Sequence, residues 1–238
     1  MPEYLIFNLY APLQSWGEIA VGEKRHSALH PSKSAIMGLL AAAFGIRRNP
    51  ESDAQHQLLF DQLNFAVRIN APGSLLRDYH TTQKPESNCI KYATRRNELL
   101  EKDLSTTLSS RDYRCDAFYT IALWSVKGYG LEKIKFALKK PVFTLYLGRK
   151  SCPLALPLNP LIYKADNLVD ALAQVTYPKE LEILLPKNQK YVEIYWEGED
   201  AKLKQIHENH KRDNIFSRSR WQFSERTEFY TTIPLNND

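Results

Sequence analysis

Two short segments of the sequence place cations where a helix start or a turn would expose backbone amide groups. Ser32-Lys33-Ser34 directly precedes an apolar stretch that predicts a helix, and a helix start beside an ammonium group favours a bound anion. Gly148-Arg149-Lys150-Ser151 directly follows a predicted strand, where glycine lets a ligand approach closely and the cations can reach phosphate. Simple N-capping and a basic surface turn are the alternatives to phosphate binding at these two segments.

Positive charge is concentrated in three parts of the chain. The 238-residue sequence has a formal net charge of +5 and a pI near 9.0, which is only mildly basic. Residues 24–48 contain five Lys or Arg, two His and no acid, and residues 139–151 contain four Lys or Arg and no acid. Residues 202–226 contain seven Lys or Arg against three acids. If these parts share one face, they would bind a polyanion in a salt-sensitive manner; solvated surface charge without a partner is the alternative.

Three histidines could act as general acid and base: His26, His30 and His80. The sequence contains no metal-binding cluster and no phosphate loop of the Walker type. Its cysteines, Cys89, Cys115 and Cys152, are widely spaced without a CxxC pair and predict reduced thiols. Because a lone histidine in a basic loop is more often a phosphate ligand or a surface residue than a catalyst, the sequence favours a binding protein that is not an enzyme and needs no metal or cofactor.

The apolar pattern predicts elements in the order βαββαβ, when two early helices are counted as one layer. Strands are predicted at 4–10, 64–70, 117–126 and 142–147, and helices at 35–44, 51–63 and 131–138. Gly45 is well placed to end the first helix. The order is typical of an α+β, ferredoxin-like (RRM-like) fold, which many RNA-binding domains share with unrelated proteins.

The connection between the second and third predicted strands, residues 71–116, is far longer than a hairpin turn. It is polar and has few apolar residues for a core of its own, so we expect it to project from the body. After residue 150 the chain is broken by prolines, and a helix at 167–175 and strands at 181–185 and 191–196 predict a β-rich C-terminal elaboration. We therefore expect a domain over residues 1–150, with the insertion, and an elaboration over residues 151–238.

The longest nearly apolar run, residues 35–46, is short of the roughly 20 residues that span a bilayer. The N-terminus lacks the basic and then apolar pattern of a signal peptide. Both features favour a cytoplasmic protein without membrane contact.

Four segments, in this order and spacing, resemble the CasD family of repeat-associated RNA-binding subunits of type I-E CRISPR complexes. They are Leu13-Gln14-Ser15-Trp16-Gly17, His30-Pro31-Ser32-Lys33-Ser34 leading into Gly38-Leu39-Leu40-Ala41-Ala42, Leu76-Arg77-Asp78-Tyr79-His80-Thr81, and Tyr146-Leu147-Gly148-Arg149-Lys150-Ser151-Cys152-Pro153-Leu154. The resemblance covers residues 1–160 well and the rest loosely. It implies a ferredoxin-like body whose insertion is a projecting β-hairpin thumb.

The resemblance also implies a function. A member of this family caps the 5′ handle of the CRISPR RNA in the Cascade surveillance complex, contacts its backbone and large subunits, and reaches target DNA through the assembled complex for antiviral defence. RNA cutting is assigned to a different subunit of that arrangement. A metal-independent endoribonuclease that processes CRISPR repeat RNA is the alternative function.

The basic segments and the resemblance together predict the RNA-binding residues. Trp16 and Tyr79 would stack on unpaired bases, although aromatic residues more often belong to the core. The full predicted set is Trp16, Lys24, Arg25, His26, Ser32, Lys33, Ser34, Arg77, Tyr79, His80, Thr81, Lys91, Arg95, Arg96, Arg111, Tyr113, Arg149, Lys150 and Ser151.

Overall fold

The body of the molecule is built on a seven-stranded sheet with strand order β10-β11-β9-β4-β7-β1-β8, in which neighbouring strands are antiparallel. The computed structural model describes residues 1–238 except 87–90, 127, 129, 188, 199–201, 218 and 235–238. The strands of this sheet are β1 (Glu3–Tyr10), β4 (Leu63–Ala71), β7 (Phe118–Ser125), β8 (Leu161–Lys164), β9 (Tyr191–Trp196), β10 (His207–Ser217) and β11 (Gln222–Pro234).

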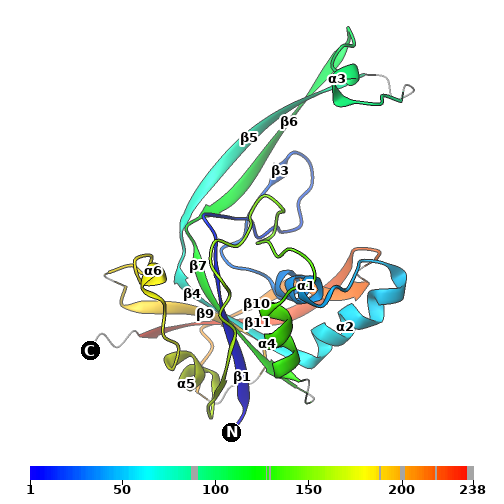
Figure 1. Ribbon diagram of the computed structural model, residues 1–238. Coiled ribbons are helices and arrows are strands. Elements are labelled where there is room, and N and C mark those ends of the chain that lie inside the picture. Colours follow the sequence, from blue (N-terminus) through cyan, green and yellow to red (C-terminus); the bar gives the residue numbers. More distant parts are fainter. Residues whose placement is uncertain are drawn as a thin grey trace.

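Helices cover both faces of this sheet (Figure 1). In β1, Leu5, Phe7 and Leu9 join one core cluster and Tyr4 and Ile6 join another, so the strand is apolar on both faces. The first cluster is closed by α1 (Lys33–Phe44), α2 (Asp53–Gln62), which follows the short η1 (Pro50–Ser52), and α4 (Leu131–Lys139). The second is closed by α5 (Leu168–Ala173), while α6 (Lys179–Glu182) packs on a small third cluster. In the described part of the chain, every helix is too short or too polar to cross a membrane.

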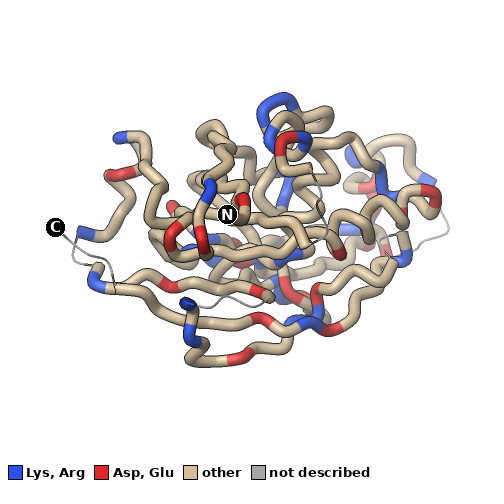
Figure 2. The backbone as a smooth tube through the Cα atoms, turned by 90° about the horizontal axis from the view of Figure 1, so that it is seen from below, with Lys and Arg blue, Asp and Glu red and all other residues tan. Residues whose placement is uncertain are grey.

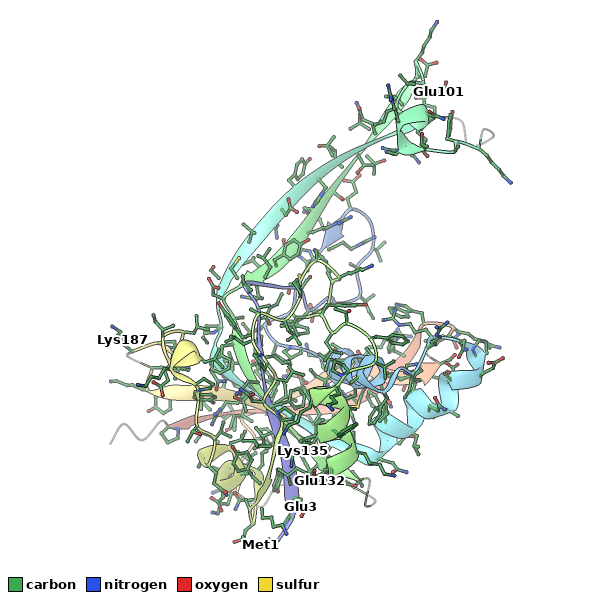
Figure 3. The ribbon with its side chains drawn as sticks, in the orientation of Figure 1. Met1, Glu3, Glu101, Glu132, Lys135 and Lys187 are labelled. Carbon is green, nitrogen blue, oxygen red and sulfur yellow. The ribbon has the colours of Figure 1, made fainter. Side chains whose placement is uncertain are left out.

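The insertion between β4 and β7 forms a long hairpin that projects from the body, which we call the arm (Figure 1). Its strands β5 (Ser74–Pro85) and β6 (Leu104–Cys115) are antiparallel, and α3 (Arg95–Glu98) lies between them in sequence. Glu101 lies at its far end (Figure 3). The short β2 (Leu13–Gln14) and β3 (Lys24–Arg25) pair with β6 and tie the base of the arm to the body. Gly73 allows the sharp entry, since its φ is +64° and a Cβ there would lie 2.2 Å from the Cys115 carbonyl oxygen.

The mixed α+β, largely antiparallel architecture agrees with the sequence prediction, and so do most elements over residues 1–139. The first helix begins after Ser32, whose side chain caps it, and ends at Gly45 with φ of +77°. The predicted strand at 142–147 is wrong. The Val142 and Phe143 amides donate instead to carbonyls at the end of α1, and β8 pairs with β1 at its free edge.

The C-terminal part also departs from prediction. The predicted strand at 181–185 is wrong, because Lys179–Glu182 form α6 and its Leu181 packs on Phe118 and Ala71. The helix near 167–175 and the strand at 191–196 are confirmed as α5 and β9. The strands β10 and β11 were not predicted, and they continue the same sheet beyond β9.

Candidate nucleic-acid interface

A hollow of about 410 Å³ lies at the base of the arm, and we call it the arm-root hollow. Its lining comes from the loop after β2, from β3 and β6, and from the turn after Leu147. The lining residues are Gly17, Glu18, Gly22, Glu23, Arg25, His26, Ser109, Arg111 and Arg149. Segments from three distant parts of the sequence therefore converge on one cationic recess.

Arg149 is held in the hollow by a turn that requires glycine. Gly148 has a φ of +84°, and a Cβ on it would lie 1.6 Å from the Ser15 carbonyl oxygen, so only glycine fits. The Arg149 guanidinium carbon stacks 4.5 Å from the centre of the Tyr113 ring. Its Nη1 is buried without a hydrogen-bond partner among the described residues. The guanidinium also lines the hollow, and an oriented guanidinium suits an anionic oxygen such as a phosphate oxygen.

A buried carboxylate organises the wall of the hollow. Asp112 accepts two hydrogen bonds from Arg77, at 2.8 and 3.0 Å, and its Oδ2 lies 3.0 Å from His26 Nδ1. The hydrogen bonds from Arg77, and then the contact with His26, lower the pKa of Asp112 to about 2. Asp112 therefore fixes His26 with its second ring nitrogen available and joins both strands of the arm to the loop that carries β3.

The other cations of the hollow lie on β3 and β6. Lys24 pairs with Ser110 and Arg25 with Arg111 in a short parallel ladder, and these three cations are exposed. The Arg25 guanidinium also donates to the Gly22 carbonyl at 2.7 Å, so this side chain folds back onto the loop that precedes β3. Five predicted RNA-binding cations and His26 are thus brought to the base of the arm: Lys24, Arg25, Arg77, Arg111 and Arg149.

The start of α1 differs sharply from the hollow. Lys33 is only 5% exposed, and its ammonium lies 2.5 Å from a Glu197 carboxylate oxygen and packs 4.1 Å over the Phe60 ring. Burial lowers the pKa of Lys33 and raises that of Glu197, and their mutual contact opposes both shifts. The Ser34 amide donates to Asp213 at 3.4 Å. A protein carboxylate thus occupies the position where the sequence predicts phosphate.

Further charges complete this region, which we call the α1 charge cluster. Arg226 donates to Asp213 at 2.6 and 3.1 Å and to Glu228 at 2.9 Å. His30 lies 3.5 Å from Glu228 and stacks on Tyr195 with ring centres 4.0 Å apart, and burial lowers its pKa. The cluster consists of His30, Lys33, Glu197, Asp213, Arg226 and Glu228, all buried or nearly so. It joins α1 to β10 and β11.

The remaining predicted residues are dispersed. Trp16 is 3% exposed and packs edge-on against Tyr119, so it belongs to the core, as the alternative to base stacking expects. Tyr79, in contrast, is 65% exposed on β5. His80 pairs with Asp78 on the arm, beside the exposed Thr81. Lys91, Arg95 and Arg96 lie far out on the arm, and Lys150 and Ser151 are exposed next to Arg149. The positions of these residues do not by themselves test RNA contact, so their RNA-binding roles stay predictions.

Four side chains at the hollow were missed from the sequence, of which Glu18 and Glu23 are acids that line it. Ser109 lines it and Asp112 orients His26, but neither type stands out in a polar strand. The one signal in the sequence that could have found Ser109 and Asp112 is their position, because both lie within two residues of Arg111 on β6. Seen from below, Lys and Arg are interspersed with Asp and Glu over the body (Figure 2), so overall charge would not have located the hollow.

Three comparisons with known proteins agree with one another. A family model described as CRISPR-associated protein, Cas5, matches residues 4–228. The protein described as CRISPR system Cascade subunit CasD of Escherichia coli (strain K12) is 35% identical over 170 residues, which are 66% of this chain and 70% of that protein. A chain in a solved CRISPR RNA-guided surveillance complex superposes with a TM-score of 0.65 at 25% identity, covering 97% of this chain and 89% of that one. A crystal structure of a Cas protein gives a TM-score of 0.57 at 25% identity, with 98% and 94% covered.

Proposed function

The chain belongs to the Cas5 family of CRISPR-associated proteins, and from this premise we propose that it binds the 5′ handle of the CRISPR RNA as a subunit of a type I-E Cascade surveillance complex. The complex would act in the cytoplasm in antiviral DNA targeting. Its backbone and large subunits would be the protein partners, and target DNA would be reached through the assembly. The relative named as a Cascade subunit and the likeness to a surveillance-complex chain support this proposal.

The arm-root hollow carries the proposal. It presents Arg111 and Arg149 beside the backbone of a glycine-containing loop, and Arg149 has a buried donor without a partner among the described residues. Phosphates of a single strand passing the base of the arm would accept hydrogen bonds from the exposed Arg111 and from the part of the Arg149 guanidinium that faces the hollow. His26, held by Asp112, would donate from its second nitrogen to a phosphate or a base edge.

The fold details belong to the same proposal. The strand order β4-β7-β1-β8, with α1 and α2 before β4 and α4 before β8, supports a ferredoxin-like βαββαβ unit. Its fourth strand would be β8 at Leu161–Lys164, so the unit would run past residue 150. The arm would be the thumb of this unit, and β9, β10 and β11 would form the elaboration on its outer edge.

Competition binding tests the proposal. Labelled RNA carrying the repeat-derived 5′ handle should bind the chain in a salt-sensitive manner and should be displaced better by unlabelled handle than by a scrambled one. The comparison is made with the purified chain and with the assembled complex. Equal competition by both RNAs in both settings would defeat handle recognition.

Shortening the arm tests its proposed role as a thumb. Thr82 pairs directly with Thr107, so residues 83–106 can be replaced by an Asn-Gly turn that keeps Asp112, Arg77 and β3 in place. The core clusters contain none of the described residues of the removed segment, so we expect normal melting and impaired assembly of the RNA-loaded complex. Normal melting together with full assembly and target-DNA binding would refute the thumb proposal.

The His26–Asp112 pair favours one second candidate, the metal-independent endoribonuclease. An exposed imidazole oriented by a buried carboxylate, with Arg111 and Arg149 nearby, has the parts of a general base beside a phosphate site. We propose binding rather than cleavage and expect repeat RNA to stay intact over hours with or without magnesium. Cleavage that His26→Asn abolishes would instead establish the second candidate.

A further inference from the structure

A second and larger recess adjoins the arm-root hollow. This groove, of about 1470 Å³, runs along α1 between the segment 143–148 and the hairpin of β10 and β11, and we call it the C-terminal groove. Its volume exceeds the roughly 300–1,000 Å³ of a small-molecule site, so it suits a segment of a polymer. Gly17, Glu18 and Arg25 line both recesses, so the two are continuous.

The charges along the C-terminal groove favour an anionic occupant. Five Lys or Arg line it against three acids, and each acid has a cationic partner: Glu18 pairs with Lys211 at 3.4 Å, and Asp213 and Glu228 share Arg226 at 2.6 and 2.9 Å. The exposed Arg47, Arg48 and Arg212 also line the groove, and none of them forms an ion pair with a carboxylate in the described part of the chain. The groove therefore keeps a surplus of positive charge together with the apolar surface of α1.

An aromatic platform stands at the far end of the groove. Trp221, at the tip between β10 and β11, is 57% exposed, and the Arg48 guanidinium carbon stacks 4.7 Å from its ring centre. Its φ is +58°, in the left-handed region that non-glycine residues occupy at an energetic cost. A large apolar side chain is thus held out toward solvent in a backbone conformation that favours glycine or asparagine.

The tip that carries Trp221 is anchored. Asp53, at the start of α2, accepts hydrogen bonds from the Ser217 hydroxyl at 2.7 Å and from the Ser219 hydroxyl and amide at 2.7 and 2.8 Å. These bonds lower the pKa of Asp53 and keep it ionised. The indole is therefore fixed in place before any ligand arrives, which reduces the entropy lost on binding.

We propose that the C-terminal groove binds the single-stranded RNA segment next to the one held in the arm-root hollow, with one base stacked on Trp221 and phosphates on Arg47, Arg48 and Arg212. An aromatic ring for stacking and guanidinium groups without carboxylate partners along one groove are the chemistry that single-stranded nucleic acid recognises. The inference rests on the proposed function for the identity of the RNA. It adds a second contact region contributed by the C-terminal hairpin.

The test measures affinity of the full chain for RNA carrying the 5′ handle, by fluorescence of the labelled RNA. Trp221→Asn removes the indole and accepts the left-handed conformation, so melting should be unchanged while affinity falls about tenfold. Trp221→Phe should recover most of the affinity. The matched control is Phe216→Ala, since Phe216 is 68% exposed on the same hairpin but does not line the groove.

Intrinsic tryptophan fluorescence gives an independent readout. Trp16 and Trp196 are buried and Trp124 is partly buried, so quenching by a stacked base should come mainly from Trp221 and vanish in Trp221→Phe. Unchanged RNA affinity in Trp221→Asn overturns the inference, and reduced incorporation into the complex would then identify a protein-docking surface instead. If Arg111→Ala weakens RNA binding and Trp221→Asn does not, the proposed function stands and the inference fails. If neither variant weakens binding, both fail.

Discussion

The α1 charge cluster and the arm-root hollow are both rich in cations, and both lie in segments that the sequence marks as basic. At the start of α1, Lys33 and Arg226 are matched by Glu197, Asp213 and Glu228 in a buried arrangement. At the base of the arm, Arg111 and Arg149 form no ion pair within the described residues, and one Arg149 donor lacks a partner there. Cations that are matched internally stabilise the fold, whereas unmatched cations remain available for a ligand.

Removing Arg226 tests the α1 charge cluster, whose cations are matched by acids, and has the largest expected effect on stability. Arg226→Met leaves three carboxylates buried near one another without their shared cation, and breaking a buried ion pair typically costs about 3–5 kcal/mol. A chain of this size loses about 2–4 °C in melting temperature per kcal/mol, so we expect a decrease on the order of 10 °C. Thermal denaturation followed by circular dichroism measures it.

The control for this variant is an exposed pair. Lys135→Met removes the contact of 3.1 Å with Glu132 on α4 (Figure 3) and should cost less than about 1 kcal/mol. Equal melting temperatures for the two variants would contradict a matched, buried cluster. If Arg226→Met does not fold at all, Asp213→Asn gives a milder loss that can be measured.

Removing the unmatched cations of the arm-root hollow should lower RNA affinity rather than stability. Arg111→Ala combined with Arg149→Gln should weaken RNA binding by about 2–3 kcal/mol, or roughly 30- to 150-fold, because two charge-assisted contacts are lost. The slope of log affinity against log salt should fall by about 1.4, at about 0.7 per phosphate contact for a single strand. Filter binding over a range of salt concentrations measures both quantities.

The same measurement on Lys187→Gln supplies the control, because Lys187 is exposed on the α6 side of the body, away from the arm (Figure 3). Its affinity and salt slope should match those of the unchanged chain. A double variant at the hollow with an unchanged salt slope would mean that RNA phosphates do not contact it.

Local patterns were sufficient for much of the fold. Alternation in β1, β4 and β7 and the serine and glycine at the two ends of α1 are properties of neighbouring residues, and those elements were predicted. The prediction of a strand at 142–147 failed because other segments make the pairings that this strand would have needed. β8 pairs with the edge of β1, and carbonyl groups at the end of α1 accept hydrogen bonds from the amides of Val142 and Phe143. β10 escaped prediction because it is an edge strand with polar residues on both faces, which removes the alternating pattern.

The candidate site divides in the same way. Basic segments that lack acids drew attention to Lys33 and Arg149, and the polar insertion over residues 71–116 drew attention to Arg111. The acids that match Lys33 and its neighbours lie in the last quarter of the sequence, at Glu197 and Asp213, so no local count could reveal them. The role of Asp112 was hidden for a related reason, since its partner His26 is 86 residues away.

Asp112 links the two kinds of region, because it is a buried acid that organises the unmatched hollow. Its pKa of about 2 lies below the ordinary value of 3.8, so its stabilising effect is complete above about pH 4 and is lost as the pH falls through 2. We expect Asp112→Asn to cost about 1–2 kcal/mol at pH 7, less than the full shift implies because Arg77 is half exposed to solvent. Urea unfolding at pH 7 and at pH 2.5 measures the difference, which should shrink at the lower pH.

Asp78→Asn is the control for that measurement, since Asp78 also lies on the arm but pairs with His80 in an exposed position. Its effect should stay below about 1 kcal/mol at pH 7. A difference between the unchanged chain and Asp112→Asn that is the same at both pH values would show that Asp112 does not act through its charge.

Ser32 gives the smallest expected effect and tests whether the start of α1 binds protein or RNA. Its hydroxyl accepts from the Ala35 amide at 3.2 Å, and Asp213 already occupies the adjacent anion position at the Ser34 amide. Ser32→Ala should therefore lower stability by about 1 kcal/mol, Ser32→Gly by only a few tenths, and both should bind handle RNA within about twofold of the unchanged chain. Melting and RNA affinity measured on the same samples decide between the two roles. If Ser32→Ala lowers RNA affinity and leaves melting unchanged, the serine contacts phosphate, and the start of α1 belongs with the hollow as part of the RNA-binding surface.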